Sequence, residues 1–197
     1  VREEQAKVPG MRLLADNFKS GAELGFALGN PDIPVLDHPL NHKHGRAPQL
    51  RLWGLQSDGS RDVPTLLVVG SSDVQYKSLL AYYHQLCEAL GPLPPPRVVN
   101  VDHGRQRFLL FTLPATRAVG ACSTPAFAWI DTPTSGADVD RQLQVTGWAF
   151  KDGEGLDRVE VLVNGKVAAS AEYGKPSPGT EAFWKVSNDP NHPDVGF

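Results

Sequence analysis

The chain has 197 residues, of which 41% are hydrophobic and 21% are charged, and its mean hydropathy is -0.27. These values are typical of a folded globular protein and exclude a largely disordered chain. The formal net charge of -3 excludes a global basic field, so we expect neither nucleic acid nor an anionic membrane surface as a partner, and no apolar run approaches the roughly 20 residues that span a bilayer.

Apolar periodicity predicts alternating strands and helices in the first part of the chain. The first elements expected there are a strand at 11–15, a helix at 18–28 with Asp16-Asn17 as its N-terminal cap, and a short strand at 33–36. A polar loop, a helix at 47–53 with Leu50 and Trp53 facing inward, a buried strand at 65–69 and a turn at 70–73 are expected next. A helix at 76–90 that ends at Gly91 is then expected, followed by strands at 97–101 and 107–113 joined through Asp102-His103-Gly104. This alternation, closed by a hairpin, predicts a three-layer α/β domain with a mainly parallel sheet over residues 1–115. A ligand site in such a domain lies beyond the carboxyl ends of the strands.

The period of the pattern changes to two after a patternless linker at 116–125. Strands are expected at 126–130, 143–150 and 158–163, and Asn164-Gly165 is a strong hairpin signal. We therefore expect residues 126–197 to form a smaller all-β, immunoglobulin-like sandwich. Such a sandwich usually has about 100 residues, so we expect this one to be incomplete, with further strands after Phe197.

The charge distribution also separates two parts of the chain. Residues 1–120 carry 13 Lys and Arg against 11 Asp and Glu, whereas residues 121–197 carry 6 against 11. Five of the six histidines lie in the first part, so polar chemistry is expected there. Two cysteines, Cys87 and Cys122, are too few for a disulfide scaffold and lack zinc-site spacing, which leaves a single bridge between them open.

The densest polar stretch directly follows the strand at 33–36. Its candidate ligand-binding residues are Asp37, His38, Asn41, His42, Lys43, His44 and Arg46. His42 and His44 would face the same way on an extended segment and could hold a metal, but a complete ligand set is not apparent, and we predict neither a metal nor a cofactor. Lys43 and Arg46 favour an anion such as a phosphate or sugar phosphate, and a hydrogen-bonded surface loop is the remaining interpretation.

Ser71 and Ser72 are further candidates, since they follow the buried strand at 65–69. Backbone N–H groups at this turn could hold an anion, and either hydroxyl could act as a nucleophile with His38 or His103 as base. An ordinary helix N-cap is the alternative. Asp102 and His103 form either a dyad or a side-chain-stabilised turn.

Three segments resemble the soluble tail of certain bacterial membrane glycosyltransferases: DNFKSGAELGF at 16–26, DHPLNHKHGR at 37–46 and QLRLWG at 49–54. The family is the dolichyl-phosphate-mannose protein mannosyltransferase and aminoarabinose transferase superfamily, glycosyltransferase family 39. The resemblance covers roughly residues 1–115. The remaining part, notably GWAF at 147–150 and YGKP at 173–176, resembles immunoglobulin-like modules appended to such tails.

The resemblance implies part of a multi-pass enzyme that transfers a sugar from a polyprenyl-phosphate carrier at the extracytoplasmic, periplasmic face of the bacterial inner membrane. The family's catalytic acid lies in an early loop between membrane helices, which this sequence does not contain, so no catalytic residue is carried over. The expected role is non-catalytic help in acceptor binding or assembly. The expected partners are the parent transmembrane domain and a lipid-linked sugar or glycan acceptor.

Two other function classes remain open. One is a free-standing α/β hydrolase that uses Ser71 or the histidine-rich loop. The other is a glycan-binding module in which Trp129 or Trp184 stacks on a sugar, whereas strand alternation places Trp148 in the core.

Overall fold

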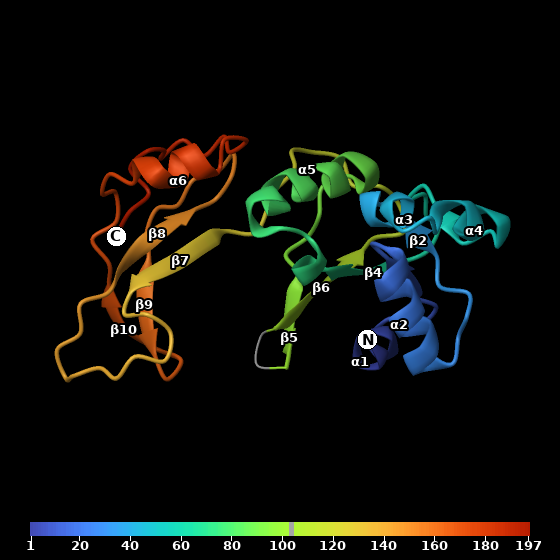
Figure 1. Ribbon diagram of the computed structural model, residues 1–197, viewed down its shortest axis with the longest axis horizontal. Helices are drawn as coiled ribbons and strands as arrows, with labels where there is room; N and C mark the ends of the chain where they lie inside the picture. The colour runs from blue at the N-terminus through green and yellow to red at the C-terminus, as the bar shows by residue number, and fades with distance from the viewer. Residues whose placement is uncertain (103–104) are drawn as a thin grey trace. The chain divides into compact units, whose positions relative to one another are not determined.

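The computed structural model describes residues 1–102 and 105–197 (Figure 1). The chain divides into two compact units, Val1–Cys122 (unit 1) and Ser123–Phe197 (unit 2), and each is described by itself. His103, which the sequence suggested as a dyad member or base, lies outside the described residues. No helix among the described residues has the length and apolar character needed to cross a membrane.

Unit 1 alternates helices and strands as the apolar pattern predicts. Its elements are α1 (Arg2–Lys7), β1 (Arg12–Ala15), α2 (Phe18–Leu28), β2 (Val35–Leu36), α3 (Pro39–Lys43), α4 (Ala47–Leu52), β3 (Gln56–Ser57), β4 (Thr65–Gly70), the 3-10 turns η1 (Ser71–Asp73) and η2 (Tyr76–Ser78), α5 (Leu79–Leu90), β5 (Arg97–Val101) and β6 (Gln106–Leu113).

The six strands of unit 1 form one sheet in the order β3-β2-β1-β4-β6-β5. The first four are parallel, and β6 and β5 close the sheet as an antiparallel hairpin. The predictions of mixed α/β structure and of a mainly parallel sheet are therefore confirmed. The chain moves from β1 outward to β2 and β3 and then returns to place β4 on the other side of β1, so the strand order reverses between β1 and β4.

Helices cover both faces of this sheet because its strands are apolar on both sides. Leu13 and Ala15 of β1 pack with Leu66 and Val68 of β4 in one apolar cluster, against which the helix residue Phe18 also lies. The intervening residues of both strands are buried on the opposite face. Figure 1 shows α1 and α2 on one side of the sheet and α5 on the other. Such double burial is typical of parallel sheets.

Local differences from the sequence predictions occur between β2 and β4. The polar stretch after β2 contains the helix α3 instead of an extended loop, because His38 caps its N-terminus and Pro39 occupies its first position. Trp53, predicted to face inward, is 65% exposed, whereas Leu50 is buried as predicted. The strand predicted at 33–36 is short, as expected: β2 has two residues and lies between β1 and β3. α1 and β3 were not predicted.

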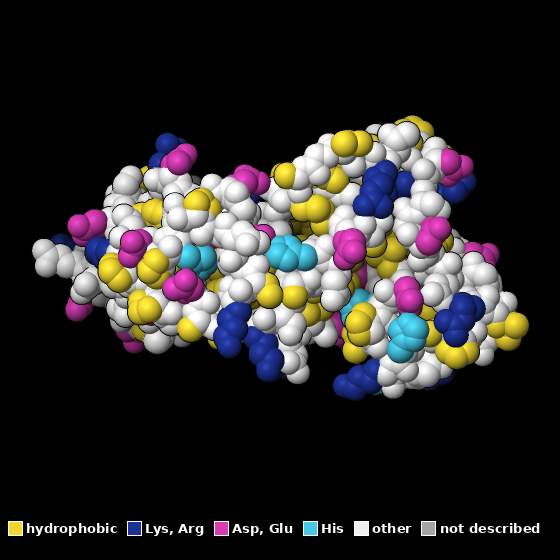
Figure 2. Space-filling model, turned by 90° about the horizontal axis from the view of Figure 1, so that it is seen from above, with side chains coloured by type: hydrophobic (Ala, Val, Ile, Leu, Met, Phe, Trp, Pro, Cys, Tyr) yellow, Lys and Arg dark blue, Asp and Glu magenta, His cyan; other side chains and the backbone are white. Residues whose placement is uncertain are grey.

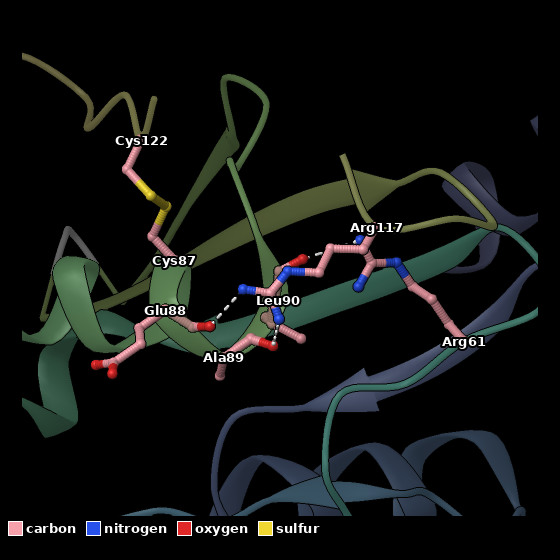
Figure 3. Close-up of a disulfide and its surroundings, with 7 residues drawn as sticks. All are labelled: Arg61, Cys87, Glu88, Ala89, Leu90, Arg117 and Cys122. Carbon is pink, nitrogen blue, oxygen red and sulfur yellow. Dashed lines mark hydrogen bonds between the residues drawn. A yellow bond between two sulfur atoms is a disulfide. The ribbon is translucent and has the colours of Figure 1, made fainter. Parts of the chain in front are cut away.

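The carboxyl end of α5 is held by a disulfide and by two arginines (Figure 3). Cys87 is bonded to Cys122 over a separation of 35 residues. Arg117 donates to the backbone oxygens of Glu88 at 2.7 Å and Ala89 at 3.1 Å, and Arg61 donates to that of Leu90 at 3.1 Å. These carbonyls are the last of the helix and have no partner within it.

Unit 2 is built from two small antiparallel sheets and one helix. Its elements are β7 (Phe127–Thr132), β8 (Thr146–Phe150), β9 (Glu160–Val163), β10 (Lys166–Ser170) and α6 (Pro178–Phe183). β7 pairs with β8 and β9 with β10. The predicted hairpin turn is confirmed, since Asn164 and Gly165 both have the positive φ that a tight two-residue turn requires.

The interior of unit 2 is an aromatic cluster. Phe127 and Phe150 stack with ring centroids 5.3 Å apart, and Trp184 lies 4.9 Å from Phe127 and 5.6 Å from Phe150. Trp148, predicted to lie in the core, is half-buried and within 5.8 Å of Phe150. Aromatic side chains bury large areas, so a few of them supply most of the core of this small unit.

Candidate functional site

The buried polar residues of unit 1 gather where β1 and β4 end. Asp16 and Asn17 directly follow β1 and have no exposed surface, and Gly70 ends β4. This is the point where the strand order reverses, and open α/β sheets form their ligand crevices there. We therefore take this carboxyl edge of the sheet as the candidate functional site.

Asp16 connects the carboxyl ends of β1 and β4 to α5 by hydrogen bonds. Its Oδ2 accepts hydrogen bonds from the Gly70 backbone N–H at 3.2 Å and from the Tyr82 hydroxyl at 3.1 Å. Burial raises the pKa of Asp16, and the negative charge of Asp73 raises it further. The hydrogen bonds from Gly70 and Tyr82 lower this pKa and oppose the effect of burial only in part. Burial likewise raises the pKa of the Tyr82 hydroxyl, so Tyr82 remains the donor in this pair.

Asn17 links this carboxyl group to a second one. Its side-chain oxygen caps α2 by accepting the backbone N–H groups of Lys19 and Ser20, and its amide nitrogen donates to Asp16 at 3.1 Å and to Asp73 at 3.4 Å. Asp73 also forms an ion pair with Lys19, which raises the pKa of that lysine. The cap predicted at Asp16-Asn17 is confirmed, with Asn17 as the capping residue.

Asn41 joins the start of α2 to the segment after β2. Its side-chain oxygen accepts the Phe18 backbone N–H at 2.9 Å, and its amide nitrogen donates to the Leu36 oxygen at 2.8 Å. The rings of Phe18 and His44 are 5.6 Å apart. Residues 16–26 and 37–46, which carry most of the family resemblance, are therefore in direct contact at the carboxyl edge.

His38 is a buried group of this edge whose hydrogen bonding is incomplete among the described residues. Its Nδ1 accepts the Leu40 backbone N–H at 3.0 Å, and its ring packs edge-on against Tyr82 at 5.0 Å. The accepted hydrogen bond leaves Nδ1 without a proton, so the neutral ring carries its proton on Nε2. Nε2 is buried and has no partner. Burial lowers the pKa of His38, which keeps the ring neutral.

A cavity of about 120 Å³ is lined in part by His38. Its polar walls are formed by side chains from the strand ends, the following loops and α5: Asp16, Asp37, His38, Ser57, Asp58, Tyr82 and Gln85. This volume is about four times the roughly 30 Å³ that one water takes up in the liquid. A hydroxyl group suits it, because it can accept from His38 and donate to a carboxylate at the same time.

The remaining residues of the 37–46 segment surround this cavity unevenly. Asp37 lines it and also contacts His42 Nε2 through Oδ1 at 2.6 Å. His42 lies in α3 and His44 caps it, so the prediction that both face one way on an extended segment is wrong. Lys43 and Arg46 are exposed and do not line the cavity. An anion is therefore a poorer match than a hydroxyl, because the ionisable wall groups include three carboxyls.

The hydroxyl groups of Ser71 and Ser72 connect η1 to β6 by hydrogen bonds. Ser71 Oγ donates to the Arg107 backbone oxygen at 3.0 Å, and Ser72 Oγ accepts the Arg107 backbone N–H at 2.7 Å. α5 begins at Leu79 with Ser78 as its cap, so Ser71 and Ser72 do not lie at its N-terminus as the sequence suggested. These contacts give both hydroxyls a structural role.

Three residues of the site were not singled out from the sequence as site residues: Asp16, Asp73 and Tyr82. Asp16 was interpreted only as part of a helix cap, and Asp73 only as part of a turn. The positions of Asp16 and Asp73 after β1 and β4 were the available signal, since parallel strands bring such residues together at one edge. Tyr82 lies within α5 and has no such signal in the sequence. Among residues 1–102 and 105–197, no group of three or more His, Cys, Asp or Glu side chains could hold a metal ion.

Comparisons with known proteins add no relative to this description. No protein-family model matches the chain, and no curated protein matches it.

Proposed function

We propose that this chain is the extracytoplasmic soluble C-terminal region of a membrane glycosyltransferase that uses a polyprenyl-phosphate sugar. Its role is non-catalytic: it binds the hydroxyl-bearing acceptor or helps to assemble the enzyme with the parent transmembrane domain. The observation that carries the proposal is that His38, whose Nε2 is buried and unpartnered, lines a polar cavity at the carboxyl edge of unit 1.

Two further observations support it. The segments that resemble the family, residues 16–26 and 37–46, pack together through Asn41 at this edge. The Cys87–Cys122 disulfide agrees with a periplasmic location, because disulfides persist in oxidising compartments and are rare in the cytosol of most organisms.

The cavity chemistry favours a sugar hydroxyl as the bound group. The hydroxyl oxygen accepts the His38 Nε2–H and the hydroxyl proton is donated to a carboxylate of the wall, such as Asp37 or Asp58. The buried donor gains a partner that it lacks in the free chain. An unsatisfied buried donor costs about 1–3 kcal/mol, so relief of this cost adds to acceptor affinity.

The test is sugar transfer by the intact protein in native membranes. His38→Asn removes the Nε2–H donor, while asparagine can still cap α3. We expect the acceptor KM to rise about tenfold, as one lost hydrogen bond of roughly 1.4 kcal/mol would produce, with kcat at saturating acceptor little changed. An unchanged acceptor KM would contradict the role of the cavity. Absence of a membrane-bound parent several-fold larger than 21.3 kDa on an immunoblot would contradict the transferase assignment.

The loop itself has a separate test in the same enzyme. Simultaneous alanine replacement of His42, His44 and Arg46, which are exposed, probes whether the outer surface of the loop meets the acceptor. Unaltered transfer would limit the acceptor contact to the His38 cavity.

We also propose that unit 2 is an immunoglobulin-like sandwich. The support is the pair of antiparallel ladders, β7 with β8 and β9 with β10, and the buried aromatic cluster around Trp184. The test is a crystal structure of unit 2 in the parent protein, where the two ladders should belong to sheets that pack face to face.

A second candidate function is glycan binding by unit 2. Trp129 on β7 is 55% exposed and therefore accessible to a sugar ring, whereas Trp184 is 2% exposed and cannot stack on a ligand from its buried position. Titration of unit 1 and unit 2 separately with glycans distinguishes the candidates, because Trp129→Ala abolishes saccharide binding only if unit 2 carries the affinity.

A further inference from the structure

A second, larger hollow lies away from the His38 cavity. It has a volume of about 670 Å³ and is bordered by α2, the loop before β2, and α4. Its walls are mainly apolar and aromatic, with Phe18, Phe26, Ile33, Leu50, Trp53 and Leu55 among them. Arg46 is the only charged side chain among the described residues that line it. We call this hollow the α2/α4 groove.

Large apolar side chains are exposed at the groove and next to it: Phe26 and Trp53 line it, and Leu52 precedes Trp53 in sequence. Phe26 is 94% exposed and Leu52 79% exposed, and Trp53 is largely exposed as noted above. They lie in the last turns of α2 and at the end of α4, where the glycines Gly29 and Gly54 reverse the chain. Exposed apolar residues that cluster in this way mark an interaction surface.

Although the net charge of the chain is negative, several basic side chains lie near these apolar tips. Arg2 donates a hydrogen bond to the backbone oxygen of Ala27, the residue after Phe26, at 3.0 Å. This contact places the Arg2 guanidinium at the carboxyl end of α2. Lys43 and Arg46 are exposed on and after α3, and residues 38–57 contain no Asp or Glu. Figure 2 shows hydrophobic side chains next to basic, acidic and His side chains at the end of unit 1 where α3 and α4 lie. The nearby acidic groups are Asp32, which follows the groove residue Pro31, Asp37, which contacts His42 of α3, and Asp58, which lines a surface pocket with Arg51 and Gly54. None of them lines the groove among the described residues.

We propose that this face of unit 1 docks on the surface of a phospholipid bilayer that carries anionic headgroups. Phe26, Leu52 and Trp53 enter the boundary between headgroups and acyl chains, the groove receives an acyl segment, and Arg46 meets a headgroup phosphate. Tryptophan and phenylalanine next to Lys and Arg are the composition of interfacial membrane anchors. The proposal uses a different surface from the His38 cavity and does not rest on the proposed function.

A protein partner fits this surface less well. The three apolar tips project from chain reversals, and protein interfaces centre instead on a packed patch from which lysine is depleted. A bilayer accepts projecting apolar tips without matching their shape, and lysine and arginine reach past them to the phosphates.

The test is flotation of the purified 197-residue chain with phosphatidylcholine vesicles, with and without phosphatidylglycerol. We expect binding to the anionic vesicles and weaker binding to the neutral ones, with a further decrease at high salt. Trp53→Ser and Phe26→Ser should each lower the partition coefficient at least tenfold. Arg46→Gln should lower it about fivefold, the usual contribution of one basic residue near an anionic surface.

Matched variants outside the face control for general effects on the fold or charge. Val98 lies on β5, at the opposite edge of the sheet from β3, and is 52% exposed, so Val98→Ser removes an exposed apolar group elsewhere. Lys77→Gln removes an exposed positive charge elsewhere. Both should bind as the unaltered chain does, and circular dichroism should show that all variants are folded.

Three results would overturn the proposal. The first is that the chain does not float with anionic vesicles. The second is that the Phe26 and Trp53 variants bind as well as the Val98 control. The third is that the lipid-free chain sediments as a dimer that Trp53→Ser converts to monomer, in which case a second copy of the chain is the occupant.

Discussion

Both units contain buried polar groups that have hydrogen-bond partners and others that have none, and the two units differ in what surrounds these groups. In unit 2, Asp189 accepts the backbone N–H groups of Lys151 at 2.5 Å and Asn191 at 2.7 Å, and Asp152 accepts that of Asn188 at 2.5 Å. Each unit also contains buried polar atoms without a hydrogen-bond partner among the described residues, His38 Nε2 and Gln56 Oε1 in unit 1 and Thr124 Oγ1 and His192 Nδ1 in unit 2, and His38 in addition lines a polar cavity. A satisfied buried group stabilises its loops, whereas an unsatisfied one lowers stability and is available to a ligand.

The largest effect should come from the aromatic cluster of unit 2. Trp184→Ala removes a buried ring that contacts Phe127 and Phe150, and we expect a loss of about 3–5 kcal/mol in the unfolding free energy of unit 2. Urea denaturation followed by NMR resolves the units. Phe183→Ala, at a half-exposed neighbour, is the matched control, and an equal loss in both variants would show that the cluster is not the core.

The disulfide should have an effect of similar size in unit 1. Closure of a loop with a separation of 35 residues stabilises a fold by about 4 kcal/mol in the chain-entropy description. Replacement of both Cys87 and Cys122 by alanine should lower the unfolding free energy of unit 1 by up to that amount and leave unit 2 unchanged. A loss confined to unit 2 would be inconsistent with the division of the chain at residue 122.

Removal of a satisfied buried carboxylate should cost less than these changes but remain clearly measurable. Asp189→Ala leaves the backbone N–H groups of Lys151 and Asn191 without their acceptor, and we expect unit 2 to lose about 2–3 kcal/mol. Chemical denaturation at pH 7 measures it. A change below about 0.5 kcal/mol would show that the hydrogen bonds to Asp189 do not stabilise unit 2.

Removal of the unsatisfied donor should have the smallest effect at neutral pH, and the effect should depend on pH. His38→Asn eliminates the orphan Nε2–H and can retain the cap, so unit 1 should change by less than about 1 kcal/mol at pH 8. The pKa of His38 is lowered below 6.5 by burial, so its contribution to stability is present above pH 6.5 and is lost as the pH falls through the folded-state pKa. The unaltered chain should therefore become less stable relative to His38→Asn below pH 6.5. A difference that stays constant from pH 8 to pH 5 would contradict the burial of His38.

The long elements of the fold could be predicted from the sequence because their patterns admit few alternatives. The apolar run at 65–69 can only be a buried strand in this context, and α5 combines an apolar stripe with a terminal glycine. Short elements carry no such signal. α3 depends on one cap, His38, and β3 is only two residues long and is defined by its partner β2.

The candidate site could be predicted only in part. The segment at 37–46 attracted attention by its charge, yet the chemistry there depends on which side chains face inward. His38 and Asn41 do so and Lys43 does not, because α3 is a helix. Asp16 and Tyr82 are 66 residues apart and meet only through the order of the strands, which composition and local spacing do not specify.

The most direct measurement of the central claim is the NMR signal of the His38 Nε2–H during titration of the chain with neutral mono- and disaccharides. The account predicts a neutral ring with its proton on Nε2, whose resonance shifts in a saturable manner with a hydroxyl-bearing sugar, while His38→Asn abolishes the binding. A proton on Nδ1, or a resonance that no saccharide shifts, would contradict it.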